Sequence, residues 1–373
     1  MQKKIAFIIR LFQDKSFHGG GEKLFYKLIS KMIRNKYVID IYCSETNVSE
    51  FPGINQIIVV DKPYCHIDPV SMEEFYNEAK KLIKDKEYDF IISENVTPPV
   101  DITFIHGHSM IYRQKKLRNI FQRFFSFNIR PVKSKRIKYE KKWLSQGYRK
   151  IFVVSNILKN DYIENFGIPE SVISVLYPGV DIPDNTNFSP SLNKTFTFGL
   201  SSPGFVRKGG YIFLKALVIL KKRGVDFKAK VIYPGFKKNL WLKILIKLYG
   251  IDKNIEFCSF QNSMQDFYEN IDCMIMPSVE EAFGLVALEA MANKKVSIVS
   301  SLSGASEIIQ DGVNGFIFNM DKNSAKNLAE KMLYLIKNKD NLKDYNKKAF
   351  ETAKIYNWDL FYNNFINELL KLG

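Results

Sequence analysis

Two glutamates that stand eight residues apart carry the clearest chemical signal in the chain. Glu281 and Glu289 flank the tripeptide Phe283-Gly284-Leu285, and an apolar run at 273–276 precedes them. This order predicts a buried strand, a turn and a helix that begins near Gly284. The N–H groups and the dipole of a helix N-terminus attract an anion such as a diphosphate. Glu289 is then placed to accept hydrogen bonds from ribose hydroxyls, and Glu281 to face a sugar.

The residues around these glutamates resemble the signature of a known family. The stretch PSVEEAFGLVALEAMA at 277–292 resembles the E-x7-E motif of retaining glycosyltransferases of family four. The segment SLSGASEIIQDGVNGFIF at 301–318, with Gly304 and Glu307, resembles the family's segment downstream of that motif. The resemblance extends over nearly the whole chain. One departure is NKKV at 293–296, where the family has C-G-x-P-V; asparagine adopts the left-handed cap conformation readily, so we expect Asn293 to keep the turn.

A cationic pair belongs to the same resemblance. Arg207 and Lys208 precede two glycines in the segment FVRKGG, after a predicted strand at 195–200. The family uses such a pair to neutralise the donor diphosphate, and fixed positive charge does stabilise a negative charge that develops during reaction. The G-R-L that usually precedes this motif is absent, and the arrangement is closer to that of lipopolysaccharide-core glucosyltransferases. Two ordinary surface cations are the alternative interpretation.

The first half of the chain offers a glycine-rich loop and two histidines. Gly19, Gly20 and Gly21 match the family's loop after the first strand, whose backbone would contact the donor phosphate or the acceptor. His106 ends an apolar run at 102–105, where the family places a histidine near the transferred sugar, and His108 is the second candidate. Taken alone, three glycines equally suit a flexible turn, and a histidine at a strand end is more often a capping or core residue.

The resemblance implies a hexosyl transfer with retention at the anomeric carbon, from a nucleotide-sugar that we expect to be a UDP-sugar. We expect front-face attack assisted by the departing phosphate, with Glu281 and His106 positioning the sugar. Paired carboxylates also suit a glycosidase, but the helix N-terminus and the cationic pair favour a nucleotide donor. No D-x-D sequence occurs, so we expect no metal ion, and we expect no other cofactor. An epimerase-like enzyme of the same fold and a non-catalytic membrane-bound subunit remain open.

Short apolar runs alternate with helical patterns along all 373 residues, which predicts parallel sheets covered on both faces and about two domains. We therefore expect an α/β protein of the GT-B type, with two Rossmann-like, doubly wound domains that face a central cleft. An acceptor-binding domain should span 1–185 and include a C-terminal helix at 356–373 that crosses back to it. A donor-binding domain should span 186–355. The predicted strands lie at 4–9, 38–42, 56–60, 89–93, 102–105, 151–155, 195–200, 228–233, 254–257, 273–276 and 297–300.

The positive charge of the chain is concentrated in one segment. Of the formal net charge of +16, the segment 113–150 carries +13, from fourteen Lys or Arg and one acid. A helical apolar face runs through the same segment, and aromatic residues accompany it, among them Trp143 and Tyr148. A basic amphipathic helix of this kind suits an anionic membrane surface. The predicted contact residues are Leu117, Phe121, Arg123, Phe124 and Phe125.

Two other interpretations of the basic segment remain open. Its apolar face could pack on its own domain, and basic-plus-aromatic sequences also bind nucleic acid, although no RNA-binding motif occurs and we expect no nucleic-acid partner. No run approaches the roughly 18 apolar residues of a membrane span, and the four cysteines, which have neither metal-ligand nor disulfide spacing, are expected to be buried thiols. We expect a cytoplasmic protein bound peripherally to the inner face of the cell membrane. Its expected partners are a nucleotide-sugar donor, a glycan or glycolipid acceptor and the anionic membrane surface.

Overall fold

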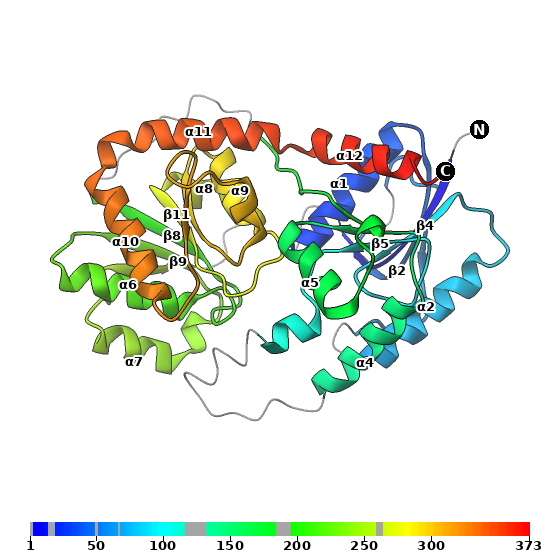
Figure 1. Cartoon of the computed structure of the whole chain (residues 1–373), viewed down its shortest axis with the longest axis horizontal. Coiled ribbons are helices and arrows are strands. Elements are labelled where there is room, and N and C mark those ends of the chain that lie inside the picture. The colour runs from blue at the N-terminus through cyan, green and yellow to red at the C-terminus, as the bar shows by residue number, and fades with distance from the viewer. Residues whose placement is uncertain are drawn as a thin grey trace. The chain divides into compact units, whose positions relative to one another are not determined.

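The computed structural model describes residues 3–13, 19–48, 51–65, 68–115, 132–183, 195–258 and 264–373, without the side chains of 132–134. The chain divides into two compact units (Figure 1). Unit 1 comprises Met1–Gly179 and Trp358–Gly373, and unit 2 comprises Val180–Asn357. The expected domain boundary at 185 and 186 lies outside the described residues.

Unit 1 is built on a seven-stranded parallel sheet in the order β3-β2-β1-β4-β5-β6-β7. Its central strands are continuous apolar runs, as expected for a parallel sheet that helices cover on both faces. In β1 the five residues at 5–9 are all fully buried. The strands are β1 (Lys4–Phe12), β2 (Val38–Thr46), β3 (Gln56–Val59), β4 (Phe90–Glu94), β5 (Ile102–Ile105), β6 (Lys150–Val153) and β7 (Ile173–Val175).

The helices of unit 1 bury one apolar face each. The helix that follows the glycine-rich loop, α1, buries Leu24, Phe25, Leu28 and Ile29. Side-chain caps that accept hydrogen bonds from first-turn N–H groups fix the start of two others: Asp68 for α2 and Ser155 for α5. The helices are α1 (Gly20–Arg34), α2 (Pro69–Ile83), α4 (Val132–Ser145), α5 (Asn156–Phe166) and α12 (Trp358–Leu370).

The C-terminal helix α12 belongs to unit 1, as the expected fold requires. The rings of Phe361 and Phe365 lie 5.9 and 6.3 Å from that of Phe104 in β5, measured between centroids. Asp359 forms an ion pair with Lys31 of α1. The preceding helix, α11 (Leu342–Ile355), belongs to unit 2. α12 begins at Trp358, where the chain enters unit 1.

Unit 2 is built on a six-stranded parallel sheet in the order β10-β9-β8-β11-β12-β13. Leu200, Val231 and Ile275 are among the fully buried residues that fill the core on this sheet. The strands are β8 (Thr197–Ser201), β9 (Lys228–Ile232), β10 (Ile255–Cys258), β11 (Cys273–Met276), β12 (Val296–Ser300) and β13 (Phe316–Phe318).

The helices of unit 2 cover both faces of its sheet. α6 joins β8 to β9 and α9 joins β11 to β12 in the opposite direction, so right-handed crossovers place these helices on opposite faces. α10 packs with α6, and α11 packs with α9. The helices are α6 (Gly210–Lys222), α7 (Leu240–Leu248), α8 (Met264–Glu269), α9 (Leu285–Ala292), α10 (Ser324–Lys337) and α11 (Leu342–Ile355).

Several details differ from the expectations. Trp143 and Tyr148 are buried core residues, not surface anchors: the Trp143 indole donates to Glu73 (3.4 Å), and the Tyr148 hydroxyl donates to the carbonyl of Thr97. Cys43 and Cys273 are buried as expected, but Cys65 is exposed and Cys258 is only partly buried.

The basic segment is described only in part. The predicted membrane-contact residues Leu117, Phe121, Arg123, Phe124 and Phe125 lie outside the described residues. Within the described part of the chain, no helix is both long and apolar enough to cross a bilayer.

Candidate active site

The candidate residues of unit 2 lie at the point where the order of its strands reverses. β8 is followed in the chain by β9 on one side, and β11 by β12 on the other side. In open α/β sheets, ligands bind outside the carboxyl ends of the strands at such a reversal. The segment 202–209 leaves β8 there, and the segment 277–284 leaves β11 there. These two segments contain the cationic pair and the first half of the E-x7-E motif.

Three charged side chains meet between these two segments. The ammonium of Lys208 donates to Oε2 of Glu281, and a guanidinium nitrogen of Arg207 lies 3.9 Å from the same oxygen. The Ser278 hydroxyl also donates to it, at 3.4 Å. The backbones are joined as well, because the N–H of Val279 donates to the carbonyl of Arg207 (3.0 Å). The Lys208 and Glu281 side chains are mostly buried, whereas Arg207 is 44% exposed. The cluster carries a net positive charge and keeps one cation open to solvent.

Glycines begin both helices that start at this point. Gly209 (φ 74°) caps α6 and Gly284 (φ 99°) caps α9, and neither helix has a side-chain cap. The first N–H groups of a helix have no partners within it, and a helix N-terminus without a side-chain cap suits an anion. At α6 the N–H of Gly210 already donates to the carbonyl of Phe205 at 2.8 Å. Glycine is required at both places: a Cβ on Gly209 would lie 1.8 Å from the carbonyl oxygen of Pro277, and one on Gly284 would lie 2.5 Å from the Met276 sulfur.

The remaining residues of the E-x7-E motif lie in α9 or hold the segment 277–284 in place. Glu289 lies in α9, where its Oε2 accepts a hydrogen bond from the Tyr268 hydroxyl at 3.4 Å. Leu285 is the first residue of α9. The Phe283 side chain is buried, and its carbonyl accepts from the N–H of Ala305 at 2.7 Å. Phe283 therefore anchors the loop through packing and through its backbone.

The downstream segment with Gly304 and Glu307 is tied to the motif. The N–H of Gly304 donates to the carbonyl of Glu281 at 3.2 Å. Gly304 begins a short 3-10 helix, Gly304–Ile308, which also contains Glu307. The two segments that carry the family resemblance, 277–292 and 301–318, are thus in direct contact in the structure.

The turn after α9 forms, but the expected residue does not take the left-handed conformation. Asn293 has φ −92°, and Lys294 has φ 56°. The N–H of Lys295 donates to the carbonyl of Ala290 at 2.9 Å, which is the long-range bond of a Schellman cap with Lys294 at the left-handed position. Asn293 stabilises the helix end differently, because its side-chain amide donates to the carbonyl of Glu289 at 2.8 Å.

In unit 1 the glycine-rich loop and His106 are in close contact. Gly19 caps α1 without a side-chain hydrogen bond, and Gly20 and Gly21 form its first turn. His106 follows β5. A Cβ atom on Gly21 would lie 2.4 Å from Cε1 of the His106 ring, which is closer than real contacts allow. The third glycine is therefore needed to let the imidazole approach the helix N-terminus.

Two residues that the sequence analysis did not single out hold the His106 ring. Its Nε2 lies 3.3 Å from Oε1 of Glu94 and 3.2 Å from the side-chain amide of Asn95. Burial alone would raise the pKa of Glu94, but the hydrogen bond and charge of His106, together with Arg10, lower it overall. Glu94 is therefore an ionised carboxylate that orients His106.

A second contact links Glu94 to the first strand. The backbone N–H of Arg10 donates to Oε2 of Glu94 at 3.0 Å, and the Arg10 guanidinium donates to Glu22 of α1 at 3.0 Å. β1 and β4 are neighbours at the strand-order reversal of unit 1. The signal that could have found Glu94 and Asn95 is their place directly at the end of a buried strand at that reversal.

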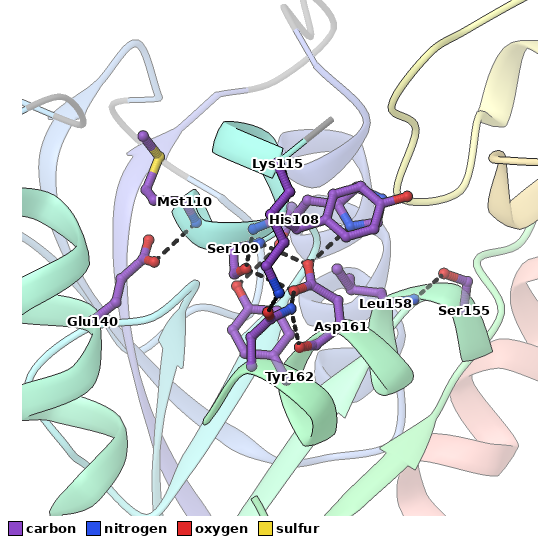
Figure 2. A network of polar contacts seen from close by, with 12 residues as sticks. His108, Ser109, Met110, Lys115, Glu140, Ser155, Leu158, Asp161 and Tyr162 are labelled. Carbon is purple, nitrogen blue, oxygen red and sulfur yellow. Dashed lines mark hydrogen bonds and ion pairs between the residues drawn. The ribbon is translucent and has the colours of Figure 1, made fainter. Parts of the chain in front are cut away.

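His108 lies in a different environment from His106 and does not share its site. Its side chain is fully buried, and its Nδ1 lies 2.9 Å from Oδ2 of Asp161 in α5. Ser109 donates to Asp161 from its N–H (2.9 Å) and from its hydroxyl (2.6 Å) (Figure 2). The Tyr112 ring stacks on that of His108, with ring centroids 4.0 Å apart. Asp161 thus fixes the segment that follows His106, and His108 is part of that support.

Further bonds hold the same segment from both sides. The carboxylate of Glu140 in α4 accepts from the N–H of Met110 at 3.0 Å (Figure 2). The Tyr162 hydroxyl donates to the carbonyl of Gly107 at 3.1 Å. Burial raises the pKa of Glu140, although Arg136 and the Met110 N–H partly offset that effect. These bonds fix the segment that follows His106.

Of the residues predicted from the sequence, the structure brings together Glu281, Arg207 and Lys208 in unit 2. In unit 1 it brings together Gly21 and His106.

Comparison with known proteins agrees with this architecture. The family model "Glycosyltransferase Family 4" matches residues 18–183, and the model "Glycosyl transferases group 1" matches residues 185–352. An uncharacterised glycosyltransferase of Methanocaldococcus jannaschii is 26% identical over 283 residues, which cover 72% of this chain and 75% of that protein.

Two solved structures share the fold. WaaG, a glycosyltransferase involved in lipopolysaccharide biosynthesis, superposes with a TM-score of 0.74 at 18% identity, over 94% of this chain and 95% of WaaG. Anabaena HepE in complex with UDP-glucose superposes with a TM-score of 0.71 at 18% identity, over 99% of each chain. The two family models match one unit each and together span most of the chain. The chain is therefore a glycosyltransferase with the GT-B fold, built from a glycosyltransferase family 4 domain and a glycosyl transferases group 1 domain.

Proposed function

We propose that this glycosyltransferase transfers a hexose from a UDP-sugar, with retention of configuration, to a membrane-associated acceptor: a glycolipid, a lipopolysaccharide or a lipid-linked glycan. One observation carries the proposal. In unit 2, two helix N-termini without side-chain caps begin at the strand-order reversal, beside the cluster of Arg207, Lys208 and Glu281. This combination suits a diphosphate that departs with negative charge.

Each candidate residue of unit 2 has a part in the proposed donor binding. Arg207 and Lys208 neutralise the diphosphate, and the N–H groups at Gly284 and Leu285 bind its oxygens. Glu289 accepts hydrogen bonds from the ribose hydroxyls, and Glu281 positions the hexose. The ion pair of Lys208 with Glu281 in the structure gives the ammonium a partner that a bound diphosphate would share. In unit 1 we propose that the backbone at Gly20 and Gly21 contacts the donor phosphate or the acceptor.

The proposed step keeps the anomeric configuration without a covalent enzyme intermediate. The bond from the anomeric carbon to the phosphate oxygen breaks as the acceptor oxygen bonds to the same face of the sugar. The acceptor hydroxyl passes its proton to a departing phosphate oxygen. His106, oriented by the ionised Glu94, positions the sugar hydroxyls in this step. We propose that no metal ion takes part, because the chain has no D-x-D sequence and supplies its own cations.

The comparisons support the substrate classes. HepE was solved with UDP-glucose, and WaaG acts in lipopolysaccharide biosynthesis. A lipid-anchored acceptor also gives a use for the positive charge of 113–150. We propose that this segment binds the anionic inner face of the cell membrane through Leu117, Phe121, Arg123, Phe124 and Phe125, and keeps the enzyme peripheral to it.

Thermal stabilisation by nucleotides tests the donor site. The purified protein is heated with UDP, GDP, ADP and their sugars, in EDTA. A ligand at about 100 times its dissociation constant stabilises a protein by roughly 2.7 kcal/mol. We expect stabilisation by UDP and UDP-hexoses that is lost in Glu289→Ala and kept in Glu351→Ala, an exposed control in α11. No shift with any nucleotide would point to a non-catalytic subunit, and a shift only with added metal would contradict the metal-free site.

A further inference from the structure

Helix α7 of unit 2 exposes an apolar face that the sequence analysis did not anticipate. Leu240 is 69% exposed, Trp241 61%, Ile244 42% and Leu248 75%. These positions are spaced by one, four and eight residues from the first, so they share one face of the helix. Four large apolar side chains on nine residues of helix form a contiguous patch rather than scattered exposed residues.

The opposite face of α7 fixes the helix on unit 2. Leu242 and Ile246 are buried and belong to the core of the unit. Asn239 caps the helix by accepting from the N–H of Leu242 at 3.0 Å. The preceding turn is anchored by Phe236, whose ring stacks on Phe257 of β10 with centroids 3.5 Å apart. Figure 1 shows α7 as an outer helix of its unit, next to α6. The exposed face is therefore displayed by a helix with a defined orientation.

The segment that carries this face is basic. The segment 236–250 contains four lysines and no acidic residue. Among the described residues, none of these lysines forms an ion pair with a carboxylate. The ammonium of Lys243 instead lies over the Phe236 ring at 5.7 Å and donates to the carbonyl of Lys237 at 2.8 Å. Lys237, Lys238 and Lys247 are exposed. Within the described part of the chain, the four lysines of 236–250 are therefore not held by ion pairs, and their charge is available to an anionic partner.

We propose that α7 is a second membrane-contact site, at which the apolar face of Leu240, Trp241, Ile244 and Leu248 enters an anionic lipid surface. A helix of nine residues is roughly 14 Å long, which is less than half a bilayer core, so α7 lies in the plane of the surface. Apolar residues with a tryptophan on one face and lysines around it are typical of interfacial helices. The uncompensated lysines favour anionic lipid over an apolar protein partner.

This inference adds a contact that the proposed function does not contain. The segment 113–150 belongs to unit 1, whereas α7 belongs to the unit with the candidate donor site. The expectation of an anionic membrane is shared with the proposed function, but α7 does not depend on glycosyl transfer or on the basic segment. Nucleotide stabilisation and lipid contact by α7 can therefore fail independently.

The tryptophans of the chain provide a direct test. Trp143 is 1% exposed and Trp358 is 4% exposed, so Trp241 alone of the three reports on a surface event. The full-length protein is mixed with vesicles of phosphatidylcholine containing about one-third phosphatidylglycerol, or with phosphatidylcholine alone. We expect a blue shift of the emission and protection from acrylamide with the anionic vesicles only. Both responses should be absent in Trp241→Phe, which keeps an apolar ring at the site.

Three results would overturn the inference. Co-sedimentation of the protein with anionic vesicles without any change at Trp241 would assign binding to another surface. An equal response of Trp241 with neutral vesicles would show that the lysines do not contribute to lipid binding, and would contradict a preference for anionic lipid. A blue shift that grows with protein concentration without lipid would show that a second copy of the chain covers the face.

A matched pair of variants measures the contribution of the face to binding. Leu248→Ser removes an exposed leucine at the end of α7, and Leu370→Ser removes one that is 56% exposed at the end of α12. We expect the first change to weaken vesicle partitioning about fivefold or more, and the second to leave it unchanged. Equal partitioning of the two variants would contradict a membrane-inserted α7.

Discussion

The His106 ring occupies the space that a side chain at position 21 would need, since a Cβ on Gly21 would lie 2.4 Å from its Cε1 atom. The glycine-rich loop and the histidine, which are 85 residues apart in the sequence, therefore form one structural element. The third glycine has a packing role that is separate from backbone flexibility. This contact links the start of α1 to the end of β5 in unit 1.

We predict that Gly21→Ala displaces His106 and lowers turnover strongly while nucleotide binding to unit 2 is kept. A misplacement of about 1 Å at a reacting centre costs on the order of 100-fold in rate. Gly19→Ala is the control, because Gly19 has extended backbone and a Cβ added there would meet no atom within 4 Å among the described residues. Turnover of the two variants, with their UDP affinities, is the measurement. Equal turnover would show that the position of His106 does not matter.

Replacing Glu94 by glutamine should destabilise unit 1 at neutral pH. The folded protein lowers the pKa of Glu94 below its unfolded value, so the carboxylate contributes stability above the unfolded pKa of about 4.3. That contribution is lost as the pH falls through the folded pKa. We expect Glu94→Gln to cost roughly 1–3 kcal/mol at pH 7, and the difference from the wild type to narrow in acid. Urea unfolding at several pH values measures this, and a difference that is constant with pH would contradict it.

Asp161 should be more important for folding than for chemistry. It is buried and accepts hydrogen bonds from both the N–H and the hydroxyl of Ser109, beside the contact with His108. In Asp161→Asn one carboxylate oxygen becomes an NH₂ group, a hydrogen-bond donor that faces the donors of Ser109. We expect a loss of about 2–4 kcal/mol in the free energy of unfolding. Asp344→Asn, an exposed change in α11, is the control for the charge. Chemical denaturation compares the two, and equal stability would remove the supporting role of the network.

We predict that Lys208→Ala strongly lowers turnover, whereas loss of an exposed cation elsewhere does not. Lys208 is mostly buried against Glu281, and we place it on the departing diphosphate. Removing one such group costs about 100- to 1000-fold in turnover. Arg223→Ala removes an exposed cation at the end of α6 and should leave turnover unchanged. A Lys208→Ala enzyme with normal turnover would contradict the assignment of the cationic pair.

The C-terminal helix should respond to acid through Glu368. Hydrogen bonds from Lys371, Ser174 and Lys150 lower the pKa of Glu368 to about 2. Because the folded pKa is lower than the unfolded one, this carboxylate stabilises the docking of α12 above about pH 4.3, and the effect is lost between about 4.3 and 2. Glu368→Gln should remove this part of the acid sensitivity. Hydrogen exchange of α12 at neutral and acidic pH tests it; an unchanged acid response in the variant would refute it.

Much of the fold could be predicted because apolar runs mark buried parallel strands. The runs at 4–9 and 273–276 correspond to β1 and β11, with β1 longer at its end. β7 and β13 were missed, since each has only three residues and no distinctive pattern. The left-handed residue after α9 was misplaced by one position, because the sequence favours Asn293 while the hydrogen bonds of the cap select Lys294.

The candidate site was predictable only where a motif is local in sequence. The pairing of Lys208 with Glu281 joins two segments that motifs had already marked. Glu94 and Asn95 escaped notice because their role depends on a strand neighbour and on His106, which no local pattern reveals. The sequence alone does not separate His106 from His108, because the difference between them is that the His108 side chain is fully buried. It also does not reveal the exposed face of α7, because that face depends on which side of the helix packs on the core.

Turnover of a UDP-hexose in EDTA, followed by proton NMR of the sugar released to acceptor or water, tests the central claim most directly. We predict that the first sugar formed has the α configuration of the donor, and that Lys208→Ala slows its formation about 100- to 1000-fold. A first product of β configuration would contradict retention. Turnover that depends on added Mg²⁺ would contradict the metal-free cationic site.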